Sequence, residues 1–199
     1  MNFDIGNFIS ALVGAFIGGV ATFASIFLND CLENERKKCD SNDAIYATLQ
    51  AIREELIGLR KQYMETVGSQ LESTDNDTPF LFYYSATEDY FTIYNQNASK
   101  MGQINDDALR ANIVAIYIQI KSLLDTYKSN NNLLEKYNYY SLLYSETNSS
   151  THYEKSHGYY QSLLEYLPCI KSAHNKAMSL GDEVITEITK YLNSHKKSS

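Results

Sequence analysis

The pattern of hydrophobic and polar positions begins with an uncharged run, because residues 5–28 contain no Asp, Glu, Lys or Arg. As an α-helix this run would be about 36 Å long, enough to cross a ~30 Å hydrocarbon core with some tilt. We therefore expect residues 1–28 to form a transmembrane anchor. A cleaved signal peptide is the alternative, but residues 1–4 carry no Lys or Arg to supply its basic start.

Two stripes run along this expected helix. Bulky Phe side chains fall on one face, whereas small and slightly polar side chains recur every three or four residues on the other. Small residues let helices approach closely in a membrane, so we expect the chain to form a homo-oligomer through this face. In a larger ring the same face would line a water-filled opening. The predicted oligomerisation and pore-lining residues are Asn7, Ser10, Ala11, Gly14, Gly18, Thr22 and Ser25.

Charged residues flank the run unequally. Arg36, Lys37 and Lys38 follow it, whereas Asp4 precedes it. Basic flanks of membrane helices stay on the cytoplasmic side. The pattern therefore predicts a single-pass protein of the bacterial inner membrane, with the N-terminus outside and the C-terminal domain in the cytoplasm.

The rest of the chain has the hydrophobic periodicity of helices. Residues 29–43 are polar and are expected to form a juxtamembrane stalk. Between residues 44 and 193, apolar positions repeat every three or four residues. The expected helices cover about 44–71, 87–101, 105–146 and 151–192. The predicted fold is therefore all-α: the transmembrane helix followed by a cytoplasmic antiparallel four-helix bundle with long helices.

Three local features modify these expected helices. The asparagines at 130–132 are poor helix formers and are expected to bend or end the third helix. Pro168 is expected to kink the fourth, because proline lacks a backbone donor. Residues 194–199 are expected to be a disordered tail.

Composition excludes some classes of function. The net charge is -7 and Lys and Arg total 17 among 199 residues, so direct nucleic-acid binding is not expected. Two prolines in the whole chain are typical of long uninterrupted helices. Three widely spaced cysteines form neither a disulfide framework nor a pattern of metal ligands.

Residues that could carry chemistry are few. The sequence has no GxSxG, P-loop or HExxH motif, so we expect no catalytic residue, no metal, no cofactor and no enzymatic activity. Glu154 and His157 have the spacing of half a di-iron motif, but a second copy is missing and both are interpreted as surface residues. Arg110, near the start of an apolar helix, is either solvated or part of a partly buried ion pair. Its expected partners are Glu54, Glu55, Glu88 or Asp89.

One resemblance to known proteins concerns residues 88–137, "EDYFTIYNQNASKMGQINDDALRANIVAIYIQIKSLLDTYKSNNNLLEKY", together with the N-terminal run and its basic flank. This layout resembles the membrane accessory proteins of type VI-B CRISPR systems. The resemblance implies a HEPN-like helical domain, assembly into a ring-shaped membrane pore and a role in antiphage defence. Active HEPN ribonucleases use an Arg followed by a His after four to six residues. That pair is absent here, which implies a non-nucleolytic version.

Three functional hypotheses follow. The first is a non-enzymatic, self-assembling membrane protein that forms a pore or perturbs the membrane in antiphage defence, with the lipid bilayer, copies of itself and a cytosolic defence effector as partners. The second is a membrane-tethered adaptor or sensor that recruits a cytosolic partner without a pore. The third is a hydrolase or nuclease with an unrecognised site that uses His157, Glu154 or Arg110.

Overall fold

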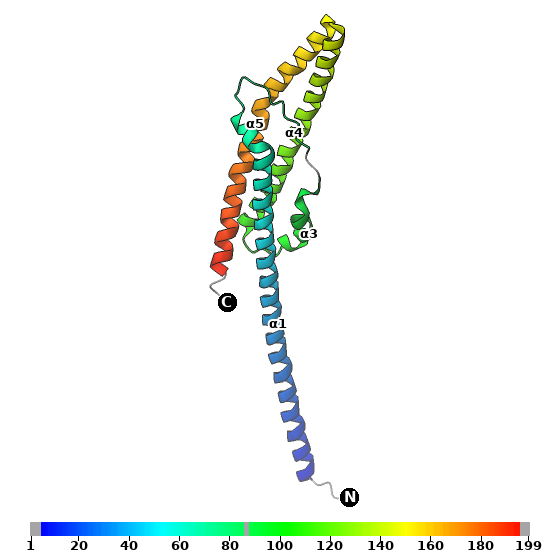
Figure 1. Ribbon diagram of the computed structural model, residues 1–199. Helices are drawn as coiled ribbons and strands as arrows, with labels where there is room; N and C mark the ends of the chain where they lie inside the picture. The colour runs from blue at the N-terminus through cyan, green and yellow to red at the C-terminus, as the bar shows by residue number, and fades with distance from the viewer. Residues whose placement is uncertain (1–4, 86–87, 196–199) are drawn as a thin grey trace. The chain divides into compact units, whose positions relative to one another are not determined.

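The computed structural model describes the backbone of residues 5–85 and 88–195, and the side chains of residues 25–37, 40–85 and 90–194. Every regular element over these residues is helical, as Figure 1 shows. The chain divides into two compact units, residues 1–46 and 47–199, and each is described by itself. The α-helices are α1 (Ile5–Tyr63), α2 (Ser69–Ser73), α3 (Thr92–Met101), α4 (Asp107–Thr147) and α5 (Ser150–His195). A π-helical turn, Met64–Gly68, joins α1 to α2, and a 3-10 turn, Glu88–Phe91, precedes α3.

The prediction of a transmembrane anchor over residues 1–28 is wrong. Among the residues that the structure describes, no helix is long and apolar enough to cross a membrane. The described part of α1 soon becomes charged, and Glu33 and Lys37 form an exposed ion pair at 2.8 Å one turn apart. The finding also contradicts the predicted single-pass placement in a bacterial inner membrane.

Most of the residues predicted to line an opening cannot be compared with the structure. The side chains of Asn7, Ser10, Ala11, Gly14, Gly18 and Thr22 lie outside the described residues. Ser25 is described, and its side chain is exposed.

Residues 47–194 form a helical bundle in which α4 is parallel to α1 and antiparallel to α5, the directions that an up-and-down order gives to its first, third and fourth helices. Residue numbers rise together in the contacts of α1 with α4, from Glu55–Tyr117 to Tyr63–Tyr127, so these two helices are parallel. They run in opposite directions in the contacts of α4 with α5, which makes α5 antiparallel to α4, as Figure 1 shows. The predicted second long helix is instead the ten-residue α3.

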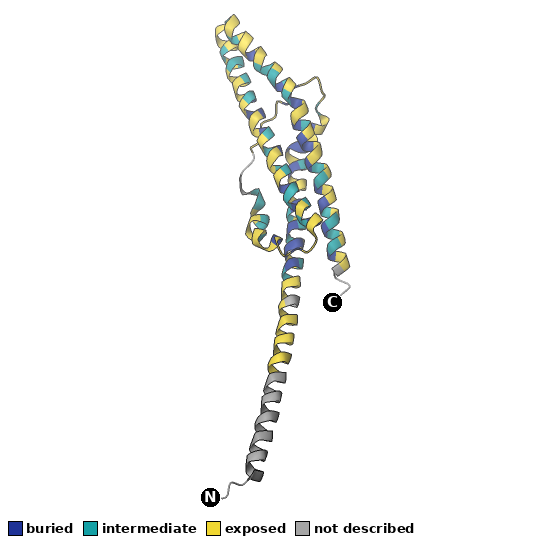
Figure 2. Cartoon of the chain, turned by 180° about the vertical axis from the view of Figure 1, so that it is seen from behind, coloured by how far each residue is buried: buried dark blue, intermediate teal, exposed yellow. Residues whose placement is uncertain are grey.

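The helices form where the apolar stripes predicted them. Asp106 caps α4, because its carboxylate accepts a hydrogen bond from the backbone N–H of Leu109 at 3.0 Å. Asn148 ends the helix in the left-handed conformation, at φ 48°. The stripes are buried between the helices, as the dark blue residues of Figure 2 show, and each large aliphatic side chain contributes about 1.5–3 kcal/mol. The fully buried aliphatic residues include Leu49, Ile52, Ile113, Ile116, Leu123, Leu163, Leu167, Ile170 and Ile188.

The asparagine run does not interrupt α4, contrary to the prediction. The amide of Asn131 pairs with the backbone of Tyr84, accepting from its N–H at 3.2 Å and donating to its carbonyl at 2.8 Å. Asn130 donates to the carbonyl of Phe80 at 3.1 Å. These asparagines therefore hold the non-helical segment 74–85, whose backbone groups would otherwise lack partners against the helix. This segment returns the chain so that α4 can lie parallel to α1.

Candidate functional site

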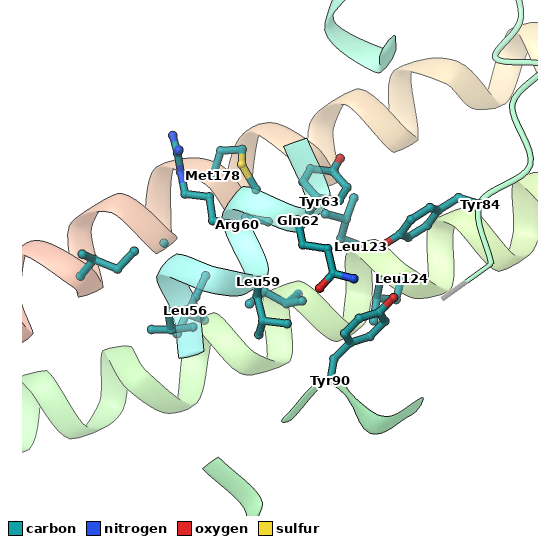
Figure 3. Close-up of a pocket in the computed structure, with 15 residues that line it drawn as sticks. Leu56, Leu59, Arg60, Gln62, Tyr63, Tyr84, Tyr90, Leu123, Leu124 and Met178 are labelled. Atoms are coloured by element: carbon teal, nitrogen blue, oxygen red, sulfur yellow. The ribbon is translucent and has the colours of Figure 1, made fainter. Parts of the chain in front are cut away.

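An apolar pocket lies between α1, α4 and α5 (Figure 3). Its volume is about 50 Å³. Gly181 of α5 helps to leave this space, because it presents no side chain to the pocket wall. Arg60 and Gln62 are the exposed polar residues at its mouth. The complete lining is Leu56, Leu59, Arg60, Gln62, Tyr63, Tyr84, Tyr90, Ile116, Ile120, Leu123, Leu124, Ala177, Met178, Gly181 and Ile185.

A hydrogen-bonded chain of polar groups, buried except at its Glu72 end, runs from one wall of this pocket. The hydroxyl of Tyr63 lies 2.9 Å from the hydroxyl of Tyr127 and 2.8 Å from Nδ1 of His174. Nε2 of His174 lies 3.2 Å from a carboxylate oxygen of Glu72. An ionised carboxylate only accepts, so with neutral imidazole Nε2–H donates to Glu72 and Nδ1 accepts from Tyr63. Tyr127 then donates to Tyr63, and every group in the chain is satisfied.

The protonation of the tyrosines limits what this network can do. Burial, as the largest cause, raises the pKa of Tyr63 well above its usual range and the pKa of Tyr127 to about 12. Both hydroxyls are therefore protonated at neutral pH and cannot act there as general bases. His174 is 3% exposed and Tyr127 is fully buried. The geometry thus fits a structural network better than a catalytic one.

Long-range hydrogen bonds to Glu55 hold α3 against α1. The carboxylate of Glu55 in α1 accepts hydrogen bonds from the backbone N–H groups of Ile93 and Tyr94 at 2.7 and 3.1 Å. These groups belong to the first turn of α3, where an anion also stabilises the helix dipole. Glu55 accepts a third bond from the hydroxyl of Tyr117 at 2.6 Å.

The tethered α3 builds one wall of a second hollow of about 420 Å³ against α4. The rings of Tyr94 and Tyr117 stack there with centroids 3.9 Å apart, and Phe91 meets Tyr117 edge-on at 5.3 Å. Lys121 and Lys128 stand at the same hollow with Asp125.

Replacing Glu55 with alanine is expected to lower the free energy of unfolding by about 2–3 kcal/mol, because three donors lose an anionic acceptor at once. Urea denaturation measures this change, and amide hydrogen exchange shows whether α3 detaches. Glu54→Ala is the matched control: Glu54 pairs only with Arg53 in the described contacts and is 58% exposed, so less than about 0.5 kcal/mol is expected. Equal losses in the two variants would contradict the tethering role of Glu55.

The far end of the α4–α5 hairpin presents aromatic side chains to solvent. In Figures 1 and 2 this end extends beyond the other helices of the 47–199 unit, and most of it is exposed. We define the tip surface as its four exposed large apolar residues. They are Tyr139 (58% exposed), Leu142 (58%), Tyr144 (38%) and Tyr153 (52%).

Ring contacts order the tip surface. Tyr144 of α4 meets Tyr153 of α5 with centroids 5.3 Å apart, and Tyr139 meets Tyr140 at 5.1 Å. Tyr140 in turn stacks on Tyr159 at 5.7 Å, while the ammonium of Lys155 lies 4.9 Å from the centre of the Tyr140 ring. These contacts link both helices of the hairpin and restrict the rotation of the rings.

The residues that the sequence singled out lie apart from the pocket. Arg110 forms its ion pair with Asp107 at 2.7 Å, a partner outside the predicted set, and donates to the carbonyl of Ile104 at 2.8 Å. Its side chain is 35% exposed. Glu154 and His157 are exposed near the hairpin end, where the ring of His157 stacks on Tyr153 at 6.0 Å. Within the described part of the chain, no three potential ligands lie close enough to hold a metal ion.

Sequence reasoning missed the groups that shape these surfaces. Tyr63 and Tyr127 lie at the helical spacing of apolar positions, but that spacing does not indicate that their hydroxyls form a hydrogen bond. Glu55 looks like any charged residue on the helix surface, although its partners lie 38 and 39 residues further along the chain. Only the density of tyrosines between 137 and 160 could have indicated the hairpin end.

Comparisons with protein-family models, with curated proteins and with solved structures found no match.

Proposed function

We propose that this protein acts by binding another protein, without enzymatic chemistry, and that the tip surface is the docking site. The observation that carries the proposal is the exposure of four large apolar side chains on an ordered hairpin end. Such a surface has no evident role in folding, because no helix of the described 47–194 region covers it in Figures 1 and 2. Exposed apolar side chains that gather at one end of a domain are candidates for an interaction site.

The chemistry of the tip surface suits protein recognition. Tyrosine supplies a large apolar ring with a polar hydroxyl and few rotatable bonds, which makes it frequent among the residues that dominate binding energy. The rings at the hairpin end already contact one another, so little side-chain entropy remains to be lost on binding. Lys136 and Lys155 lie over tyrosine rings at 5.7 and 4.9 Å and give the surface a polar rim.

This proposal keeps the adaptor hypothesis in a form without a membrane. The buried Tyr63–His174 network offers no base that is accessible to a substrate, which favours binding over catalysis. Self-assembly and a role in antiphage defence remain predictions that rest on the resemblance of residues 88–137 and the N-terminal run.

Site-specific photo-crosslinking tests the proposal. A photoreactive amino acid is placed at Tyr144, within the tip surface, or at Tyr83, which is 53% exposed elsewhere on the same unit. In the cells that make the protein, we expect one discrete protein adduct from position 144 and none of that mass from position 83. An adduct of twice the chain mass would identify a second copy as the partner.

Two variants test whether binding depends on the tip surface itself or only on the total area of exposed apolar side chains. The tip variant carries Tyr139→Gln, Leu142→Gln, Tyr144→Gln and Tyr153→Gln. The control variant carries the same number of changes at exposed apolar residues elsewhere: Ile57→Gln, Leu81→Gln, Tyr83→Gln and Ile118→Gln. In both variants the photoreactive group is placed at Tyr159, near the same end. We expect the tip variant to lose the adduct and the control variant to keep it. Absence of any adduct from the hairpin end in the wild-type background would overturn the proposal.

A further inference from the structure

We infer that the protein partner is acidic where it binds: carboxylates of its Asp or Glu side chains lie against Lys136 and Lys155, while its apolar side chains cover the tip surface. This inference rests on the proposed binding function and adds the charge of the partner to it. Each lysine contacts a tyrosine ring, and we name Lys136, Tyr140, Lys155 and Tyr159 the lysine–tyrosine cluster.

The lysine–tyrosine cluster takes two residues from α4 and two from α5. Its tyrosine rings stack with centroids 5.7 Å apart and with an angle of 10° between their planes. The ammonium group of each lysine lies over the ring from the opposite helix, at 5.7 Å for Lys136 over Tyr159 and at 4.9 Å for Lys155 over Tyr140. Attraction between the cations and the rings therefore holds both positive charges at one place on the hairpin.

Both ammonium groups keep the capacity to bind an anion. Lys136 and Lys155 are exposed, and neither forms an ion pair within the part of the chain that the structure describes. An ammonium group has three N–H donors, and a ring face occupies only one side of it. Since the rings already restrict the lysine side chains, a carboxylate that binds them has less side-chain entropy to remove than in an ordinary surface ion pair.

The acidic residues of the same hairpin end leave this positive charge in place. Glu135, Glu146 and Glu154 are exposed, and none of them forms an ion pair with Lys136 or Lys155 in the described structure. A carboxylate of the partner would therefore meet two ammonium groups that no carboxylate of this chain contacts directly. This charge complementarity is what favours an acidic partner.

The cluster fits an acidic protein better than a nucleic acid. The faces of the Tyr140 and Tyr159 rings are already engaged by each other and by the two ammonium groups, so little ring surface is left for a base to stack on. The net charge of -7 also opposes a long polyphosphate chain. A few carboxylates need only short-range attraction to one pair of lysines, which the rest of the chain opposes less because salt screens distant charges.

The lysine–tyrosine cluster is continuous with the tip surface. The ring of Tyr140 meets the ring of Tyr139, a residue of the tip surface, with centroids 5.1 Å apart. One segment of the partner can therefore contact both. Charged groups beside an apolar contact select the partner and speed its association, so we expect the partner segment to combine apolar residues with Asp or Glu.

Selection from a phage-displayed library of random peptides against the full chain tests the inference. We expect enriched peptides to contain an excess of Asp and Glu, and to bind Lys136→Gln/Lys155→Gln about tenfold more weakly than the wild type, because two charge-assisted contacts are lost. Enriched peptides without this excess, no enrichment, or equal binding to both chains would overturn the inference. Labelled oligouridylate that binds more tightly than the peptides would overturn it in favour of a nucleic acid.

A matched control separates the cluster from a general loss of positive charge. Lys176→Gln/Lys190→Gln removes two other exposed lysines, both in α5 and without an ion pair in the described structure. This control should bind the enriched peptides within about twofold of the wild type. A loss as large as that of Lys136→Gln/Lys155→Gln would show that the peptides respond to net charge and would overturn the inference.

Charge reversal gives a second readout. The same selection against Lys136→Glu/Lys155→Glu should enrich Lys and Arg in place of Asp and Glu, as expected when the charge at the cluster determines the choice. Selection against Lys176→Glu/Lys190→Glu should keep the acidic preference. All four substituted lysines are exposed, so each variant should keep the fold, which circular dichroism checks. An unchanged preference after reversal at the cluster would show that the acidic peptides bind elsewhere.

Photo-crosslinking from position 144 separates failure of this inference from failure of the proposed function. In the Lys136→Gln/Lys155→Gln background we expect the adduct to form in lower yield than in the wild type. An adduct of undiminished yield there, lost in the tip variant, would leave the tip surface as the docking site and exclude the acidic contact. Absence of the adduct from the wild type itself would count against the proposed function.

Discussion

Tyr127→Ala is expected to lower the free energy of unfolding by about 3–5 kcal/mol, the cost of deleting a large buried aromatic side chain. Tyr127 is fully buried, and its ring lies 5.1 Å from that of Tyr84 and 6.1 Å from that of Phe80. Its loss would leave a cavity between α4 and the non-helical segment 74–85, and would remove the donor that Tyr63 uses. Chemical denaturation monitored by circular dichroism measures the change.

Tyr127→Phe separates the packing from the hydrogen bond. The ring stays in place, and Tyr63 keeps its bond to Nδ1 of His174, so a loss of only about 1 kcal/mol is expected. A control truncation at an exposed tyrosine, Tyr139→Ala, should cost less than about 0.5 kcal/mol. The account of the core would be contradicted if Tyr127→Ala cost no more than this control.

Alkaline pH is expected to unfold the protein, with stability falling steeply as the pH rises above about 10. Burial raises the pKa of Tyr127 from 10.0 to about 12, and also raises those of Tyr63, Tyr84 and Tyr117. Between pH 10 and about pH 12, the unfolded chain has released the proton of the Tyr127 hydroxyl, whereas the folded state still retains it. The stabilising contribution is therefore complete below pH 10 and is lost as the pH rises through the folded-state pKa. Tyr127 alone accounts for about 3 kcal/mol at pH 12.

Comparison with Tyr127→Phe isolates this residue from the other groups that titrate in the same range. The stability advantage of the wild type over this variant should be constant up to about pH 10 and should then shrink by about 1.4 kcal/mol per pH unit. Urea denaturation at several pH values, with tyrosinate absorbance as a second probe, measures the difference. An advantage that stays constant into strongly alkaline solution would show that Tyr127 is not protected from ionisation by the fold.

The helical stripes could be predicted from the sequence because burial in a helix repeats every three or four residues. Leu49, Ile52, Ile113, Leu163 and Val184 lie at such spacings within the expected helices, and each is fully buried. This part of the fold depends on local periodicity, which a single sequence contains.

The continuity of α4 and the docking of α3 could not be predicted, because they depend on polar contacts between distant residues. Propensity placed a weak point at Asn130 and Asn131, but their amides bind backbone groups 47 to 50 residues away and α4 continues through them. The carboxylate of Glu55 likewise stabilises α3 from another helix. Tertiary hydrogen bonds outweighed intrinsic propensity at both places.

The membrane assignment came from counting uncharged residues over 5–28, a count that takes no account of the mean hydropathy of the helix. Among the described residues, the structure has no helix that meets the length and hydropathy of a span. The hairpin end, which the sequence did not single out, is the better candidate for function. The pairing of α4 with α5 brings Tyr144 and Tyr153 together there.

The most direct test of protein binding through the tip surface is the dissociation constant of the crosslinked partner, measured with the purified wild-type chain, the tip variant and the control variant. We predict that the tip variant binds at least about 30-fold more weakly, since losing several exposed aromatic anchors costs 2 kcal/mol or more. The control variant should bind within about twofold of the wild type. Equal affinities for the wild type and the tip variant, with both chains folded, would contradict the account.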